Sequence, residues 1–261
     1  MLAVLRYRYL FGQMVRRELR QRYRGSALGL LWYVVNPLVL MGAYWLMFGR
    51  LLPGVSEQDY PLFLMVGLFV WLFFSQSLIS SSTAFLTHSS LIGKVRFPRQ
   101  TIPAAVVSVQ FFTFVGLLLL LAPIVVAVRG TFDPALLLLP VIVVCLFAFV
   151  LGISLMVSVL HANYRDVEPI LSAVLLPWFF LSPIFFRPER LPGVVGNEWA
   201  RILLTWVNPV APFIDATRSV LYEGATPTWN TLVYVAVAAG LALLCGLLLF
   251  RRMQRELAVV V

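Results

Sequence analysis

Long apolar runs separated by short polar segments dominate this 261-residue chain. Each run has about the 20 mostly apolar residues that a helix needs to cross the hydrocarbon core of a bilayer. Barrel strands are shorter, and open sheets leave backbone groups unpaired in lipid. The pattern predicts an all-α membrane protein with six transmembrane helices. We place these helices at about 28–48, 61–79, 104–128, 135–160, 170–186 and 231–250. Pro177 and Pro183 are expected to break the fifth helix.

Composition supports the membrane assignment and limits the chain to one domain. Apolar residues make up 61% of the sequence and charged residues 12%, a balance that a soluble chain of this length could not bury. We therefore treat 1–261 as a single transmembrane domain. The net charge of +9 comes from arginines at the ends of apolar runs. These positions indicate contact with lipid headgroups, and no nucleic-acid partner is expected.

The distribution of basic residues predicts the orientation of the helices. Fourteen of the 20 Lys and Arg residues fall in 1–27, 84–103, 161–169 and the tail after Phe250, and six fall in the alternate loops. Short loops rich in Lys and Arg stay in the cytoplasm, so both termini are expected to be cytoplasmic.

A basic amphipathic segment precedes the first apolar run. Arg16, Arg17, Arg20 and Arg24 share one side of a helical wheel, and Val15 lies opposite. Residues 5–23 are therefore expected to form an interfacial helix along the cytoplasmic surface. The alternative is a basic tail that only enforces topology.

The segment 187–228, before the last run, is too long for a tight turn and too short for two crossings. It carries two amphipathic stretches of about ten residues, or 15 Å, each. We expect short external re-entrant or gate helices in or on the outer leaflet, the alternative being an interfacial cap without function. The residues assigned to this gate are Trp199, Ile202, Trp206 and Phe213.

Motifs for enzymatic chemistry are absent from the sequence. It has no phosphate-binding loop and no His/Cys cluster with metal spacing, and His88 is expected to be a solvated loop residue. No charge lies near the middle of an apolar run, which argues against transport coupled to protons or sodium. We expect no catalytic residue, cofactor or metal in this chain, with any energy supplied by a partner.

Two cytoplasmic segments carry polar constellations. The segment 161–168 is favoured as a structural turn in which Arg165 pairs with Asp166 or Glu168. An enzyme acting on polyprenyl-linked sugars through His161, Asp166 and Glu168 is the rival interpretation. The residues assigned to the structural cluster are Asn163, Tyr164, Arg165 and Asp166.

The loop 84–103 mixes apolar and cationic side chains, which suits a short helix that docks in the groove of another protein. A plain basic loop is the alternative. The residues assigned to docking are Leu91, Lys94, Val95, Arg96 and Phe97.

Short motifs in chain order resemble a known family. They are Arg-Tyr-Arg-Gly-Ser-Ala-Leu-Gly-Leu-Leu-Trp at 22–32 with Asn36-Pro37, Val95-Arg96-Phe97-Pro98-Arg99 with Pro103, Asn163-Tyr164-Arg165-Asp166, Ser182-Pro183, and Asn208-Pro209 with Pro212. Together they resemble the permeases of ABC transporters that export O-antigen, teichoic acid and related polysaccharides, within the type-2 ABC exporters.

The resemblance implies a fold and partners. Two permease copies would assemble with two ATP-binding subunits that hold ATP and magnesium, in the bacterial cytoplasmic (inner) membrane. Residues 88–97 would form the coupling helix, 197–222 the gate helices, and the cargo would be a polysaccharide on a polyprenyl diphosphate anchor. A type-2 permease for drugs or lipids is the closest rival, and a passive channel or scaffold is a third possibility.

Aromatic residues are plentiful in the expected spans. Sugar rings stack on aromatic faces, so such residues could line a conduit for a glycan. Aromatic belts at the membrane interface and packing within the bundle are the alternatives. The candidates are Tyr33, Tyr44, Phe74, Trp178 and Phe179.

Overall fold

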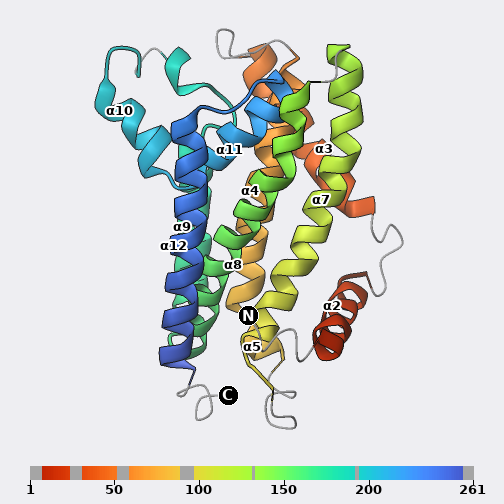
Figure 1. The fold of residues 1–261 in the computed structure, drawn as a ribbon, viewed down its shortest axis with the longest axis vertical. Coiled ribbons are helices and arrows are strands. Elements are labelled where there is room, and N and C mark those ends of the chain that lie inside the picture. Colours follow the sequence, from red (N-terminus) through yellow and green to blue (C-terminus); the bar gives the residue numbers. More distant parts are fainter. Residues whose placement is uncertain are drawn as a thin grey trace.

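The structure is a computed structural model that describes residues 8–23, 31–51, 59–88, 97–130, 133–191 and 194–254. The described residues form helices and connecting loops, with no strand among them. The long helices stand side by side (Figure 1). We call the end of the bundle that holds α2 and the last turn of α12 the proximal end, and the opposite end the distal end.

The helices follow the chain in this order. The proximal helix and the first half of the bundle are α2 (Arg8–Tyr23), α3 (Trp32–Tyr44) continued by π-helical η2 (Trp45–Leu51), α4 (Tyr60–Ser82), α5 (Ala84–Thr87) and α7 (Thr101–Arg129). The second half is η3 (Pro134–Leu138), α8 (Leu139–Asn163), α9 (Val167–Leu181), η4 (Pro188–Arg190), α10 (Glu198–Ile202), η5 (Leu203–Val207), α11 (Ala211–Arg218), η6 (Ser219–Glu223) and α12 (Trp229–Met253).

Within the described residues, five helical stretches are long and apolar enough to cross a membrane. They are Val34–Leu51, Tyr60–Ser82, Thr101–Arg129, Pro134–Asn163 and Trp229–Met253. Each coincides with a predicted span. The sixth apolar helix, α9, has only 15 residues.

The course of α9 differs from the prediction at one proline. The helix continues through Pro177, so the expected break there is wrong. A proline is tolerated within such a helix because neighbouring helices can satisfy the backbone groups that it frees. The chain leaves the helix at Ser182, which is extended because Pro183 follows it and disfavours helical geometry.

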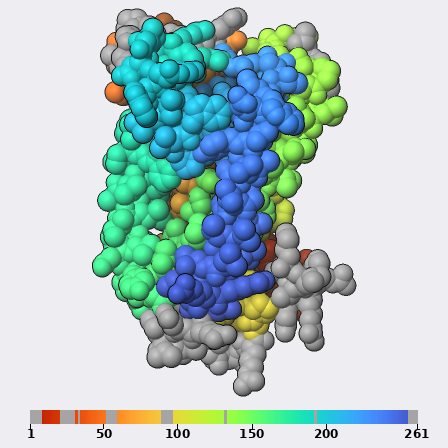
Figure 2. Space-filling model, turned by 60° about the vertical axis from the view of Figure 1, so that its left-hand side comes forward, coloured from red at the N-terminus to blue at the C-terminus, as the bar shows by residue number. Residues whose placement is uncertain are grey.

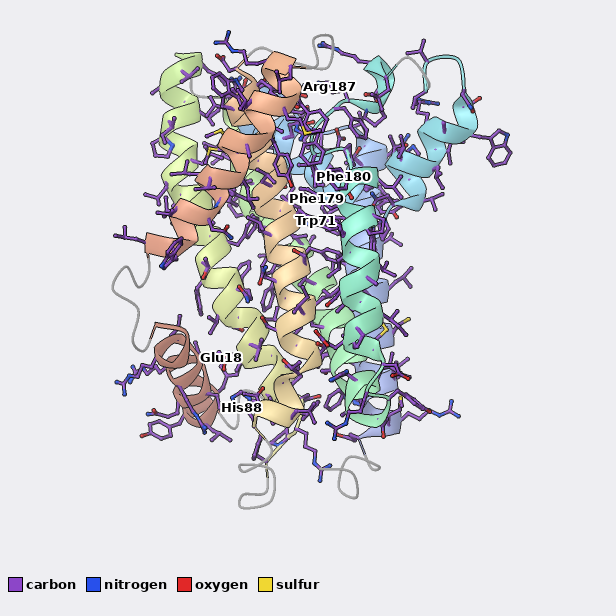
Figure 3. The ribbon with its side chains drawn as sticks, turned by 180° about the vertical axis from the view of Figure 1, so that it is seen from behind. Glu18, Trp71, His88, Phe179, Phe180 and Arg187 are labelled. Carbon is purple, nitrogen blue, oxygen red and sulfur yellow. The ribbon has the colours of Figure 1, made fainter. Side chains whose placement is uncertain are left out.

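Helix α4 forms the centre of the bundle. Residues 61–74 of this helix are apolar on every side, which is typical of a helix with neighbours around most of it, and 72% of its apolar window is buried. Phe63, Leu64 and Phe74 on this helix have no exposed surface. Helices α3 and α9 both pack on α4, and Figure 3 shows them on either side of it.

Helix α2 falls within the segment 5–23, for which the sequence predicts an amphipathic helix. Met14 and Val15 are buried in a cluster with Phe85 and Val106, while Arg16 and Arg20 are exposed. The apolar face therefore packs on the proximal half of α7.

The segment before α12 forms the two short helices expected, but they take different positions. Figure 1 shows α10 standing out from the bundle, whereas α11 lies inside its distal end. Phe213, Ile214 and Leu221 are buried, because α11 and η6 pack among α4, α8 and α12. The second amphipathic stretch thus buries its apolar side in the protein.

Candidate functional site

A non-helical turn after α9, residues 182–186, is the point where the distal elements meet. We call it the distal turn. The Tyr60 hydroxyl of α4 donates a hydrogen bond to the Phe185 carbonyl over 2.7 Å. The Arg218 guanidinium of α11 donates to the carbonyls of Pro183 over 2.8 Å and of Ile184 over 3.2 Å. Backbone that has left helical geometry is therefore satisfied by side chains from two neighbouring helices.

Asn208 connects this turn to the α10–α11 corner. Its amide nitrogen donates to the Ser182 hydroxyl over 2.9 Å. Its amide oxygen accepts from Trp178 Nε1 over 2.9 Å and from the Val210 backbone over 3.1 Å. Two of the motifs singled out in the sequence, Ser182-Pro183 and Asn208-Pro209, thus contact each other directly.

Arg218 is a buried charge that sequence reasoning missed. Its side chain is 4% exposed, and the guanidinium carbon lies 3.6 Å from the centre of the Phe63 ring, a cation–π contact. Gly67 makes room for it, because a Cβ there would lie 2.8 Å from Arg218 Nη2. The sequence does not single out Arg218, because the periodicity of an amphipathic stretch does not show what packs on its polar side.

Four of the predicted conduit aromatics come together beside α4. Tyr44 and Phe179 have ring centres 5.6 Å apart, and Phe74 and Trp178 are 5.3 Å apart. Trp71 contacts both Trp178 and Phe179 (Figure 3). The side chain of Tyr33 lies outside the described residues.

The side chains that are exposed on α4 and α9 are not the ones that the sequence favoured as conduit residues. Phe74 is fully buried and Phe179 nearly so, so both pack the core. Phe180 is 47% exposed, and Gln76, in the apolar stretch of α4, is exposed as well. An amide in a transmembrane run was an available signal for Gln76, because polar groups within a bilayer are costly.

The four predicted gate residues do not form one surface. Trp199 is 83% exposed on α10, and Ile202 is half-buried. The ring of Trp206 packs on Tyr234 of α12. Phe213 is fully buried and stacks on Phe149 with ring centres 4.8 Å apart.

The 161–168 turn is held differently from the expectation. The Glu168 backbone donates to Nδ1 of the buried His161 over 3.2 Å, so the imidazole caps the start of α9. Asn163 Nδ2 donates to the Val159 carbonyl over 2.8 Å. Tyr164, Arg165 and Asp166 are exposed, and within the described part of the chain Arg165 has no ion pair. The expected Arg165 pairing is therefore wrong, and His161 has a structural role.

The predicted docking loop falls largely outside the described residues. Leu91, Lys94, Val95 and Arg96 are outside the described part of the chain. Phe97 is described, and it packs against the buried cluster that α2 forms with α5 and α7.

Both flanks of this loop are anchored. His88 Nε2 lies 3.5 Å from Glu18 Oε2 of α2 (Figure 3). Arg99 Nη1 donates to the Gln254 carbonyl, just after α12, over 3.2 Å. His88 is 4% exposed, so the expectation of a solvated histidine is wrong.

The Glu18–His88 contact is expected to stabilise the docking of α2. In a double-mutant cycle with Glu18→Gln and His88→Gln, the coupling free energy should be about 1 kcal/mol, because both side chains are largely buried. Denaturant unfolding in detergent measures it. The exposed Glu198–Arg201 pair serves as control and should show almost no coupling. Additive single substitutions at positions 18 and 88 would contradict the prediction.

The apolar bundle, its short distal helices and its anchored proximal loop define a polytopic membrane protein, and comparison with known proteins identifies its class. Residues 9–222 match the ABC-2 type transporter family, so the chain belongs to that family. It is a multi-pass protein of the bacterial inner membrane. Among the described residues, no group of three His, Cys, Asp or Glu side chains could hold a metal ion.

Several relatives are similar over nearly their whole length. The O-antigen export system permease protein RfbA of Myxococcus xanthus is 31% identical over 97% of this chain and 95% of its own. An RfbA protein of Klebsiella pneumoniae is 28% identical over 96% and 95%. The polysialic acid transport protein KpsM of Escherichia coli is 26% identical over 92% of both chains.

Proposed function

We propose that this chain is the membrane permease of an ATP-driven exporter that moves a polysaccharide across the cytoplasmic membrane, carried on a polyprenyl diphosphate anchor. The end-to-end similarity to O-antigen export permeases carries this proposal. ATP and magnesium would bind to a separate ATP-binding subunit, since the sequence has no phosphate-binding loop. Two permeases and two ATP-binding subunits would form the complex, with both termini of each permease in the cytoplasm.

The face that carries α3, α4 and α9 would meet the second copy. Only 6% of the apolar window in the first span is buried within this chain. On α9, Leu176 and Leu181 are exposed. Apolar surface of this kind faces either lipid or another subunit, and two copies meeting here would enclose a path between them.

Polar and aromatic groups on that face suit a glycan. Gln76 offers amide hydrogen bonds, and Phe180 together with the half-buried Trp178 offers aromatic surface. An aromatic surface lets sugar rings slide past with weak contacts, which suits a long polymer better than a tight pocket does.

The proximal end would transmit conformational changes of the ATP-binding subunit to the membrane helices. The docking loop lies between His88, which contacts α2, and Arg99, which contacts the residue after α12. A push on this loop by an ATP-binding subunit would reach two helices at once. Leu91, Lys94, Val95, Arg96 and Phe97 are the proposed contacts with that subunit.

Reconstitution with the cognate ATP-binding subunit tests the function. We expect a stable complex whose ATP hydrolysis is stimulated by a polyprenyl-diphosphate oligosaccharide. Replacing Lys94, Val95 and Arg96 together by alanine should reduce this stimulation at least about tenfold, as truncation of a docking hot spot does. Arg251→Ala with Arg252→Ala, exposed on α12 at the same end, is the matched control.

The alternative outcomes separate the rival functions. Stimulation by hydrophobic dyes or lipids, and not by the oligosaccharide, would indicate a drug or lipid exporter. Absence of any complex with an ATP-binding subunit would overturn the transporter assignment. Loss of glycan turnover in Asp166→Asn, without such a complex, would indicate an enzyme.

A further inference from the structure

The distal end holds a pocket of about 200 Å³ whose lining is both apolar and polar. Its walls come from the α9–α10 connection, η5, α11 and the first turn of α12. In Figure 2 the cyan segment that carries α10 and η5 lies at the upper left, against the blue of α11 and α12. The lining includes Glu189, Arg201, Thr205, Trp206, Asp215 and Thr231. Pockets for drug-sized ligands usually measure roughly 300–1,000 Å³, so this one suits a single ring.

One wall of the pocket is a fixed aromatic surface. Trp206 is 37% exposed, and its ring centre lies 5.6 Å from that of Tyr234. The Tyr234 hydroxyl donates to the Trp206 carbonyl over 3.0 Å. The tryptophan is thus held by α12 at both its ring and its backbone, and it loses little freedom when a ligand contacts it.

The lining of the pocket also carries a carboxylate. Asp215 is exposed toward the pocket, and Thr231 Oγ1 donates to its Oδ2 over a long 3.5 Å. Burial by the surrounding walls raises the pKa of this carboxyl, and the neighbouring Arg218 opposes the rise. A carboxylate whose hydrogen bond from Thr231 is this long can accept further hydrogen bonds from a ligand.

The charge balance argues against an anionic ligand. Arg187 and Arg201 line the pocket, but they pair with the carboxylates of Glu223 over 2.6 Å and Glu198 over 3.1 Å. The third lining guanidinium, that of Arg218, is engaged with backbone carbonyls. Since Glu189 and Asp215 add two lining carboxylates, a phosphate would meet no excess of positive charge.

We propose that this pocket binds one neutral sugar ring, with a C–H face of the ring on Trp206 and hydroxyl groups donating to Asp215. Hydroxyls on an apolar ring fit a lining that combines an aromatic side chain with carboxylate acceptors. The inference rests on the proposed export of a glycan and deepens it. The pocket would hold successive sugar units at the distal mouth and so bias the chain against sliding back.

Saturation-transfer NMR on the purified, detergent-solubilised chain tests the site, with glucose, galactose, mannose, rhamnose and N-acetylglucosamine as probes. At least one sugar should give a signal that its competitors do not share. Trp206→Ala should lower its apparent affinity about tenfold, and Asp215→Asn should lower it as well. Trp206→Phe should retain part of the binding.

Trp229→Ala is the matched control. Trp229 is 77% exposed at the same end of the molecule and does not line this pocket, so its replacement should leave sugar binding unchanged. Thermal unfolding in detergent shows whether each variant is folded. No signal from any sugar, or equal losses in Trp206→Ala and Trp229→Ala, would overturn the proposal. Sugar binding by a chain that forms no complex with an ATP-binding subunit would overturn the exporter and keep the site.

Discussion

Replacing Gly152 with alanine is expected to destabilise the bundle by about 3 kcal/mol, because α8 and α12 touch through their backbones there. A Cβ on Gly152 would lie 2.3 Å from the Ala242 carbonyl. A Cβ on Gly246 would lie 2.2 Å from the Gly152 carbonyl oxygen. Backbone atoms cannot turn aside as a side chain can, so the two helices would have to separate. Denaturant unfolding in detergent measures the loss, and Gly246→Ala should behave alike.

Gly240→Ala provides a control with the opposite sign. Gly240 lies on α12 as well, but a Cβ there meets no atom within 4 Å. Alanine is the better helix former by about 1 kcal/mol, so this variant should unfold at the same or a higher denaturant concentration. Equal effects at positions 152 and 240 would contradict the close approach of α8 and α12.

Replacing Arg218 with methionine is expected to cost about 2–4 kcal/mol of unfolding free energy. The substitution removes the donors to the Pro183 and Ile184 carbonyls, and a buried acceptor without a partner costs about 1–3 kcal/mol. Relief from burying a charge offsets part of this loss. Arg218→Lys keeps the charge but has no planar fork, so it should recover less than half of the stability.

Two further variants separate this role from a general effect of charge. Gly67→Ala should resemble Arg218→Met, because its Cβ would occupy the space of the guanidinium. Arg252→Met removes an exposed arginine from the last turn of α12 and should change the stability by less than about 0.5 kcal/mol. If Arg218→Met unfolds at the same temperature as the unaltered protein, the distal turn does not need the hydrogen-bond donors of Arg218.

The long helices were predictable because each follows from a local property, a continuous apolar run. The course of the chain at Pro177 was not predictable, because neighbouring helices decide whether a proline interrupts a helix. The same limit explains α11. Its periodicity showed that Phe213 lies on an apolar face, yet it did not show whether lipid or protein covers that face.

Contacts between distant segments were the least accessible to sequence reasoning. The close approach that the structure shows joins Gly152 and Gly246 on different helices, and no spacing rule within one helix finds such a pair. Two motifs that carry the family resemblance, Ser182-Pro183 and Asn208-Pro209, contact each other in the fold, and the resemblance did not indicate that contact.

The shortness of α9 has a consequence for the electrostatics of the membrane. Its 15 residues extend about 22 Å, whereas the hydrocarbon core is about 30 Å thick. A helix of this length does not cross such a core by itself, so the non-helical distal turn continues the path of the chain where a further helical turn would otherwise stand. The donors of Tyr60 and Arg218 neutralise the carbonyl dipoles of that turn, and they lower the electrostatic cost of ending a helix next to a low-dielectric layer.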